Sequence, residues 1–153
     1  MLHDKEKIYK EKQRAIDDIA GKVRDPKGRI VFTKPERQLL AQLIQYCNNG
    51  IIRYQIVPQY AVKFGNIEYP IDFAIPNLRI GIEADGEAFH SNEKQIIHDK
   101  ERDMKLSQAG WTILRFKDRE IEEQVERVMT TVVKTIMQKE QNIENLKEQP
   151  KTT

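Results

Sequence analysis

Apolar residues spaced three and four positions apart predict helices in four parts of the chain. The expected helices span residues 4–23, 33–47, about 92–109, and a last segment from 118 to about 139. Thr33 and Glu36 form a Thr-x-x-Glu capping box at the start of the second helix. Ser91 is suited to cap the third helix and Gly110 to close it. Beyond about residue 139 the chain is polar and is expected to fray.

Runs rich in β-branched and aromatic residues predict strands between these helices. The expected strands span residues 51–57, 59–64, 67–75, 79–85 and 111–116. The resulting order, αβββαβα with an extra N-terminal helix, predicts an α/β fold with a mixed sheet flanked by helices. The expected organisation is a helical extension and linker over 1–29, a folded domain over 30–140 and a polar tail over 141–153.

The composition limits the compartment and the partners of the protein. Charged residues make up 33% of the 153 residues, yet the net charge is only +2, so a basic surface requires local clustering. The single cysteine, Cys47, excludes an internal disulfide and fits a reducing, cytoplasmic setting. No run of about 18 apolar residues is present, so no membrane association is expected.

Acidic residues gather on two strands that are expected to be neighbours. Side chains alternate along a strand, so Glu83 and Asp85 share one face of the strand 79–85. If this strand pairs with 67–75 as a hairpin, the apolar faces coincide and Asp72 lies on the side of Glu83 and Asp85. The apolar faces expected to coincide are Ile71, Phe73 and Ile75 on one strand and Ile80, Ile82 and Ala84 on the other. Three neighbouring carboxylates call either for a compensating cation or for exposure to solvent, and the pattern leaves both open.

Other polar residues near this cluster have two possible roles. Glu36 lies on the apolar side of its helix, where it either caps the helix or points at a site. His90 follows the acidic strand and is either a proton acceptor or an ordinary loop histidine. Asp99 either orients an imidazole or is a solvated charge. For Asp103 and His98 the interpretation as solvated charges is favoured.

The segment YPIDFAIPNLRIGIEADGEAFH, followed by DKERDMKLSQAGWTILRF, resembles the restriction-endonuclease-like nucleases, written PD-(D/E)XK. The resemblance covers about residues 33–117 and is nearest to very-short-patch repair endonucleases and to phage homing-endonuclease catalytic domains. It implies a metal-dependent endonuclease that hydrolyses double-stranded DNA with Mg²⁺ or Mn²⁺. The roles that it implies are metal binding for Asp72, the acidic motif position for Glu83, a metal-ligating carbonyl for Ala84, support of the metal's water shell for Glu36, proton abstraction for His90, and orientation of that histidine for Asp99.

The sequence departs from this family at several positions. Asp85 replaces the usual lysine, which favours His90 or a metal-bound water as the proton acceptor, and the metal ligand is either Glu83 or Asp85. The structural zinc of the repair enzymes needs several Cys and His ligands and is not expected with one cysteine and three histidines. Of the aromatic pair that wedges beside a mismatch, only Phe89 is present. A homing-type nuclease is therefore favoured over a repair nickase.

DNA contacts are expected from residues near the acidic strand. The candidates are Phe89, Lys94, Lys100, Arg102 and Arg115. Phosphate contacts of this kind give affinity without reading the base sequence. The sequence does not fix the oligomeric state, the target, or whether DNA recognition is carried by a further module. Two other classes stay open, namely a nuclease fold that binds DNA without cleaving it and an interaction protein that acts through its terminal helices.

Overall fold

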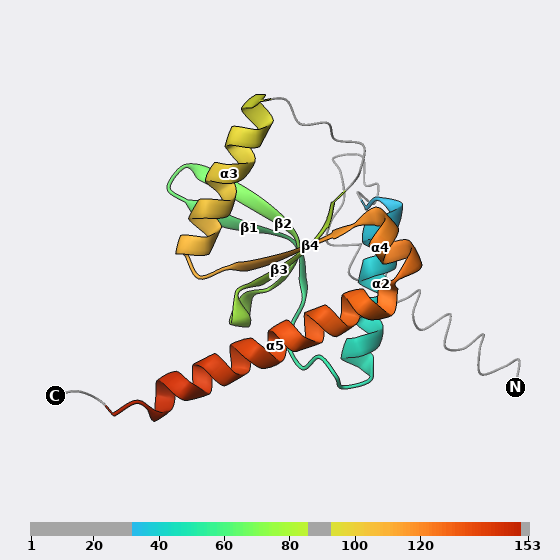
Figure 1. Ribbon diagram of the computed structural model, residues 1–153, viewed down its shortest axis with the longest axis vertical. Helices are drawn as coiled ribbons and strands as arrows, with labels where there is room; N and C mark the ends of the chain where they lie inside the picture. Colours follow the sequence, from blue (N-terminus) through green and yellow to red (C-terminus); the bar gives the residue numbers. More distant parts are fainter. Residues whose placement is uncertain (1–31, 86–92, 151–153) are drawn as a thin grey trace, which may run out of the picture.

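The computed structural model describes residues 32–85 and 93–150, which form a four-stranded sheet flanked by helices (Figure 1). In chain order the elements are α2 (Lys34–Asn48), β1 (Val57–Phe64), β2 (Ile67–Ile75), a short 3₁₀ helix η1 (Pro76–Leu78), β3 (Ile80–Asp85), α3 (Glu93–Gln108), β4 (Thr112–Lys117), α4 (Asp118–Glu123) and α5 (Val125–Glu148). This confirms the α/β class and the αβββαβα order. The expected N-terminal helix, the linker and the Ser91 cap lie outside the described residues.

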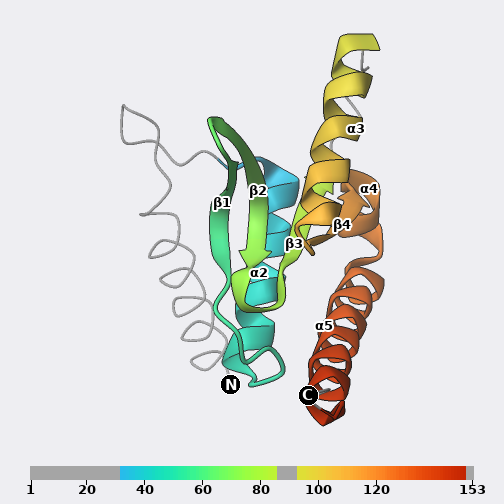
Figure 2. The ribbon, with the colours of Figure 1, turned by 90° about the vertical axis from the view of Figure 1, so that its left-hand side faces the viewer.

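The sheet is mixed and follows the order of the chain, β1-β2-β3-β4. The first three strands pair antiparallel, and β4 returns parallel to β3 after the α3 crossover. Figure 1 shows α3 on one side of the sheet and α2, α4 and α5 on the other. In the perpendicular view α3 extends past one end of the sheet and α5 past the other (Figure 2).

Each face of the sheet has its own apolar core. The larger core joins the sheet to α2 and α5. It includes five fully buried side chains, those of Leu40, Leu43, Phe73, Ile82 and Val132. The smaller core lies under α3 and is built on Ile71, Ala74 and Leu106. Burial on both faces makes β2 and β3 the central strands, so a polar group carried by them is held on a rigid support.

Three expectations about the elements are corrected. Residues 51–56 form no strand, because the N–H groups of Ile51 and Ile52 donate to the Tyr46 carbonyl and close the end of α2 instead. The last helix is two helices, since the backbone of Gln124 (φ −134°, ψ 42°) leaves the helical region. Residues 139–148 are helical rather than frayed, because α5 continues to Glu148.

None of the helices in the described ranges is long and apolar enough to cross a membrane.

Candidate active site

The alternation of side chains along β2 changes phase at Asp72. Ile71 packs in the α3-side core, whereas Phe73 packs in the α2-side core, although neighbours two apart normally share a face. The expectation that Ile71 shares the face of Phe73 and Ile75 is therefore wrong. The adjoining strand is irregular at the same level: Gln59, between the β1 partners of Ile71 and Phe73, has a left-handed backbone with φ of 50°. Asp72 thus lies at a local distortion of the sheet.

Strands β2 and β3 separate at this distortion. Their register runs from Ile75↔Ile80 to Phe73↔Ile82 and ends there. The next N–H of β3 that faces β2 belongs to Ala84, and it donates to Asp72 Oδ2 over 3.0 Å. In an antiparallel ladder the N–H and C=O of one residue face the same neighbouring strand, so the Ala84 carbonyl also faces β2. We call this place, formed by Asp72 and Ala84, the β2–β3 fork.

The carboxyl group of Asp72 is held in an environment that disfavours its charge. Burial, and then the negative charges of Glu36 and Glu83, raise the pKa of Asp72 from 3.8 to about 7. The Ala84 N–H and Arg102 oppose this shift without cancelling it. Burial and the nearby Asp118 likewise raise the pKa of Glu36. The fork therefore carries negative charge that the surrounding protein does not compensate.

Glu36 has the capping role that its position suggested. Its carboxylate accepts a hydrogen bond from the Thr33 N–H (3.1 Å), and its own N–H donates to Thr33 Oγ1 (3.4 Å), which completes the capping box. The same carboxylate acts on Asp72 through its charge. The cap thus fixes Glu36 beside the fork.

Glu83 lies beside the fork but is bound by arginines on the α3 side. Its Oε1 accepts from Arg102 Nη2, and its Oε2 accepts from Arg115 Nε at 3.3 Å. Arg102 also donates to the Pro70 carbonyl (3.1 Å), and Arg115 Nη1 donates to Asp103 Oδ2 (3.0 Å). We call Glu83, Arg102, Asp103 and Arg115 the arginine clamp.

Asp103 is the residue that the sequence interpretation missed. It is no isolated solvated charge, because both of its oxygens accept from Arg115. These hydrogen bonds hold the pKa of Asp103 below its ordinary value. The signal available in the sequence was its helical position next to Arg102, which gives no hint of a partner on β4.

The remaining predicted site residues are distributed around this centre. Asp85 is exposed at the end of β3, and its register partner on β4 is Lys117. Asp99 on α3 is half-buried and accepts a hydrogen bond from Gln95 (2.9 Å). Lys94 and Lys100 are exposed on α3. His90 and Phe89 lie outside the described residues, so their predicted roles stay predictions.

The oxygen atoms at the fork are the type of ligand that a hard divalent cation prefers. Asp72 offers a carboxylate and Ala84 a carbonyl, and oxygen ligands suit Mg²⁺ or Mn²⁺. A cation there would offset the burial, and the repulsion by Glu36 and Glu83, that raise the pKa of Asp72. Within residues 32–85 and 93–150, however, no three Asp, Glu, His or Cys side chains are grouped closely enough to form a complete ligand set.

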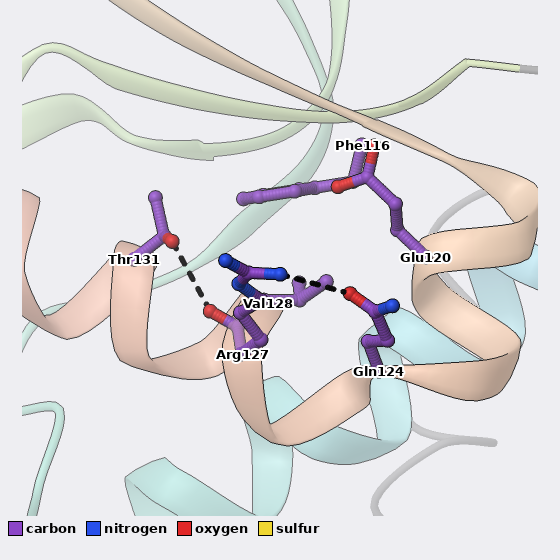
Figure 3. A pocket seen from close by; sticks show the side chains of 6 residues that line it. All are labelled: Phe116, Glu120, Gln124, Arg127, Val128 and Thr131. Atoms are coloured by element: carbon purple, nitrogen blue, oxygen red, sulfur yellow. Dashed lines mark hydrogen bonds between the residues drawn. The ribbon is translucent and has the colours of Figure 1, made fainter.

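A separate small pocket lies between β4, α4 and α5 (Figure 3). It encloses about 90 Å³ and is lined by Phe116, Glu120, Gln124, Arg127, Val128 and Thr131. Arg127 donates to the Gln124 side chain at 3.5 Å, and the Thr131 hydroxyl donates to the Arg127 carbonyl at 3.1 Å. The pocket shares no lining residue with the fork or the arginine clamp.

An αβββαβα core with acidic residues where two central strands separate defines the restriction-endonuclease-like nucleases. The family model REase_MTES_1575, which describes a restriction-endonuclease family, matches residues 36–136. The protein belongs to this family.

A solved structure supports the same fold. The chain is similar to the "Homing Endonuclease I-Bth0305I Catalytic Domain" with a TM-score of 0.51 and 20% sequence identity, over 71% of this chain and 98% of that one. At this identity the likeness concerns the fold. Among curated proteins none matches the sequence.

Proposed function

We propose that the protein is a divalent-metal-dependent endonuclease that hydrolyses phosphodiester bonds in double-stranded DNA at the β2–β3 fork. The observation that carries the proposal is the uncompensated Asp72 carboxylate, hydrogen-bonded to Ala84 where the two central strands separate. The membership of the chain in a restriction-endonuclease family supports the same chemistry.

Asp72 and the Ala84 carbonyl would hold Mg²⁺ or Mn²⁺, together with Glu83 or Asp85. A bound ion of this kind polarises the scissile phosphate and stabilises the leaving oxygen. Glu36 adds negative charge next to Asp72 and is fixed by its own helix cap.

The other residues of the chain supply proton transfer and phosphate binding. His90 is the proposed acceptor of the proton from the attacking water, and Asp99 is proposed to orient it. Arg115, whose side chain is 37% exposed, is better placed to meet a phosphate than Arg102, whose side chain is 13% exposed. Lys94 and Lys100 on the exposed side of α3 would add phosphate contacts.

Two further features bear on the kind of endonuclease. The similarity to a homing-endonuclease catalytic domain and the lack of a complete aromatic wedge favour a homing-type catalytic domain over a very-short-patch-type nickase. A nuclease fold that binds DNA without cleaving it is the second candidate. Two observations favour this second function: Asp85 stands where the family usually has lysine, and Glu83 is held by two arginines.

Incubation with supercoiled plasmid tests these possibilities. We expect nicked or linear product with Mg²⁺ or Mn²⁺ and none with excess EDTA. Asp72→Asn should abolish cleavage, and His90→Ala should slow it by roughly 10²- to 10⁴-fold, while both variants still bind DNA. DNA binding without cleavage by the wild-type protein would favour the second candidate. Nicking that persists in excess chelator would contradict the metal mechanism.

A further inference from the structure

Glu83 has both carboxylate oxygens occupied by arginines from two different elements. Arg102 comes from α3 and Arg115 from β4, and each reaches a different oxygen of Glu83. Only 14% of the Glu83 side chain is exposed. Each oxygen keeps a second lone pair, but a metal ion bound there would lie next to a guanidinium of the same charge, which opposes its binding.

The two arginines are themselves fixed by further acceptors. The Pro70 carbonyl accepts from Arg102 at 3.1 Å, and Asp103 accepts two hydrogen bonds from Arg115. Asp103 also lies 3.7 Å from Arg102 Nη1, so it contacts both arginines. Removing Glu83 from this clamp would deprive the nearly buried Arg102 of the carboxylate to which it donates a hydrogen bond, which is unfavourable for a charge of low exposure.

The charges of the clamp balance, whereas those of the fork do not. Two arginines face two carboxylates in the clamp. Glu83 is therefore neutralised by its own neighbours, while Asp72 and Glu36 stay uncompensated next to it. A cation is drawn to the side of Asp72 rather than to Glu83.

Asp85 differs from Glu83 in these respects. It follows Ala84 directly, shares the strand face of Glu83 and is exposed at the end of β3. In the part of the chain that the structure describes, no hydrogen bond or ion pair engages its carboxylate. Its oxygens can turn to a metal without breaking an existing interaction.

We propose that Glu83 is a positioning residue that anchors the arginine clamp, and that Asp85 takes its place as a metal ligand with Asp72 and the Ala84 carbonyl. The inference rests on the proposed metal site and decides between the two acidic residues of the motif. It also gives Asp103 a role, because Asp103 keeps Arg115 beside Glu83.

Binding of Mn²⁺ to the full chain without DNA tests this inference, with free Mn²⁺ measured by electron paramagnetic resonance at pH 8. Asp72→Asn and Asp85→Asn should each weaken binding by about tenfold or more, since each removes a ligand. Glu83→Gln removes no ligand but leaves the clamp with one positive charge in excess, so it should weaken binding clearly less than either of these two variants. Circular dichroism of each variant verifies the fold.

A second variant keeps the test independent of how well Glu83→Gln folds. Arg115→Gln frees Oε2 of Glu83, so we expect it to raise Mn²⁺ affinity more than the control Arg119→Gln, which removes the same charge from an arginine on α4 that is 76% exposed and pairs with Glu123. In the Arg115→Gln background, Glu83→Gln should then weaken binding by about tenfold, a clear departure from additivity.

The outcomes separate the clamp from the metal site itself. Loss of Mn²⁺ binding in Glu83→Gln to the extent of Asp72→Asn, with normal binding by Asp85→Asn, would overturn the clamp and leave the metal site standing. Equal effects of Arg115→Gln and Arg119→Gln would also overturn it. Wild-type protein that binds no Mn²⁺, or an Asp72→Asn variant that binds it normally, would overturn the metal site and the clamp together.

Discussion

Asp72 is the residue on which several features of the site act together. It lies where β2 changes phase, accepts from the Ala84 N–H and is surrounded by the charges of Glu36 and Glu83. A carboxyl group kept in such surroundings is unfavourable for folding unless it is protonated or paired with a cation. Its presence on a central strand is typical of a functional position.

The stability of the metal-free protein should therefore depend on pH through Asp72. Its pKa is about 7 in the folded protein and near 3.8 when unfolded, so the folded state binds more protons between these values. Stability then decreases as pH rises from about 4 through 7. Asp72→Asn removes this effect and keeps an acceptor for Ala84, so in EDTA it should be more stable than wild type by about 1 to 3 kcal/mol at pH 8.

Urea unfolding at pH 8 and pH 4.5 measures this difference. The advantage of Asp72→Asn should shrink toward zero at the lower pH, where the wild-type carboxyl is protonated. An equal difference at both pH values would mean that the charge of Asp72 is not what destabilises the protein.

Gly81 makes a second prediction at the scale of a residue. A Cβ atom at this position would lie 2.6 Å from Ile113 Cδ1 and 2.9 Å from Ile71 Cγ2. Gly81→Ala should therefore lower the free energy of unfolding by about 1 to 3 kcal/mol through overpacking. Ile113→Val removes the nearer carbon atom, so the double variant should recover part of the loss in chemical denaturation. No recovery in the double variant would show that Ile113 is not the limiting contact.

The sequence predicts individual acidic residues better than it predicts their partners. Asp72, Glu36 and Glu83 follow from strand alternation, the capping box and the family resemblance, and the structure brings the three together. The clamp partners Arg102 and Asp103 come from α3, and their contacts depend on how that helix packs across β4. Such contacts between distant segments leave no periodic signal in the chain.

Among the elements, those with strong local signals were predicted most closely. The strand 67–75 coincides with β2, and the capping box places the start of α2 within a residue. The apolar run 51–57 was misread as a strand because Ile52 is buried by a loop rather than by pairing. The phase change at Asp72 was also missed, since alternation assumes a regular strand.

The cap of α2 gives a prediction at this scale. Thr33→Ala removes the hydroxyl that accepts from Glu36 N–H and should lower the free energy of unfolding by about 1 kcal/mol. Thr33→Ser keeps a hydroxyl and should stay near wild type in the same thermal or urea measurement. If the alanine and serine variants lose equal stability, the methyl group rather than the cap is responsible.

At the scale of the whole molecule, helix α5 is longer than the core that it covers. The buried residues of α5 end at Ile136, yet the helix runs on to Glu148 and past the end of the sheet (Figure 2). Among the described residues, the last hydrogen bonds that join α5 to the rest of the chain run from Lys139 to the Gly110 carbonyl at 3.1 Å and from the Tyr54 hydroxyl to Glu140 at 2.8 Å. The part of α5 beyond these contacts is exposed, including Leu146 at 69%.

Truncation distinguishes a nuclease from a protein that acts through its terminal helix. A chain that ends after Gln141 keeps every buried residue of α5 and should lose less than about 0.5 kcal/mol of stability. A chain that ends after Thr135 also loses Ile136, Lys139 and Glu140, and should be less stable by about 2 kcal/mol or more.

Plasmid cleavage by the chain that ends after Gln141 completes the comparison. Because the fork lies on β2 and β3, the chain ending after Gln141 should cleave at close to the wild-type rate with Mg²⁺. A folded truncation that binds DNA but no longer cleaves would show that the exposed end of α5 takes part in the reaction, for example by joining two copies of the chain. Retained cleavage would instead confine the activity to the sheet and the helices packed on it, and would count against an interaction protein that works through α5.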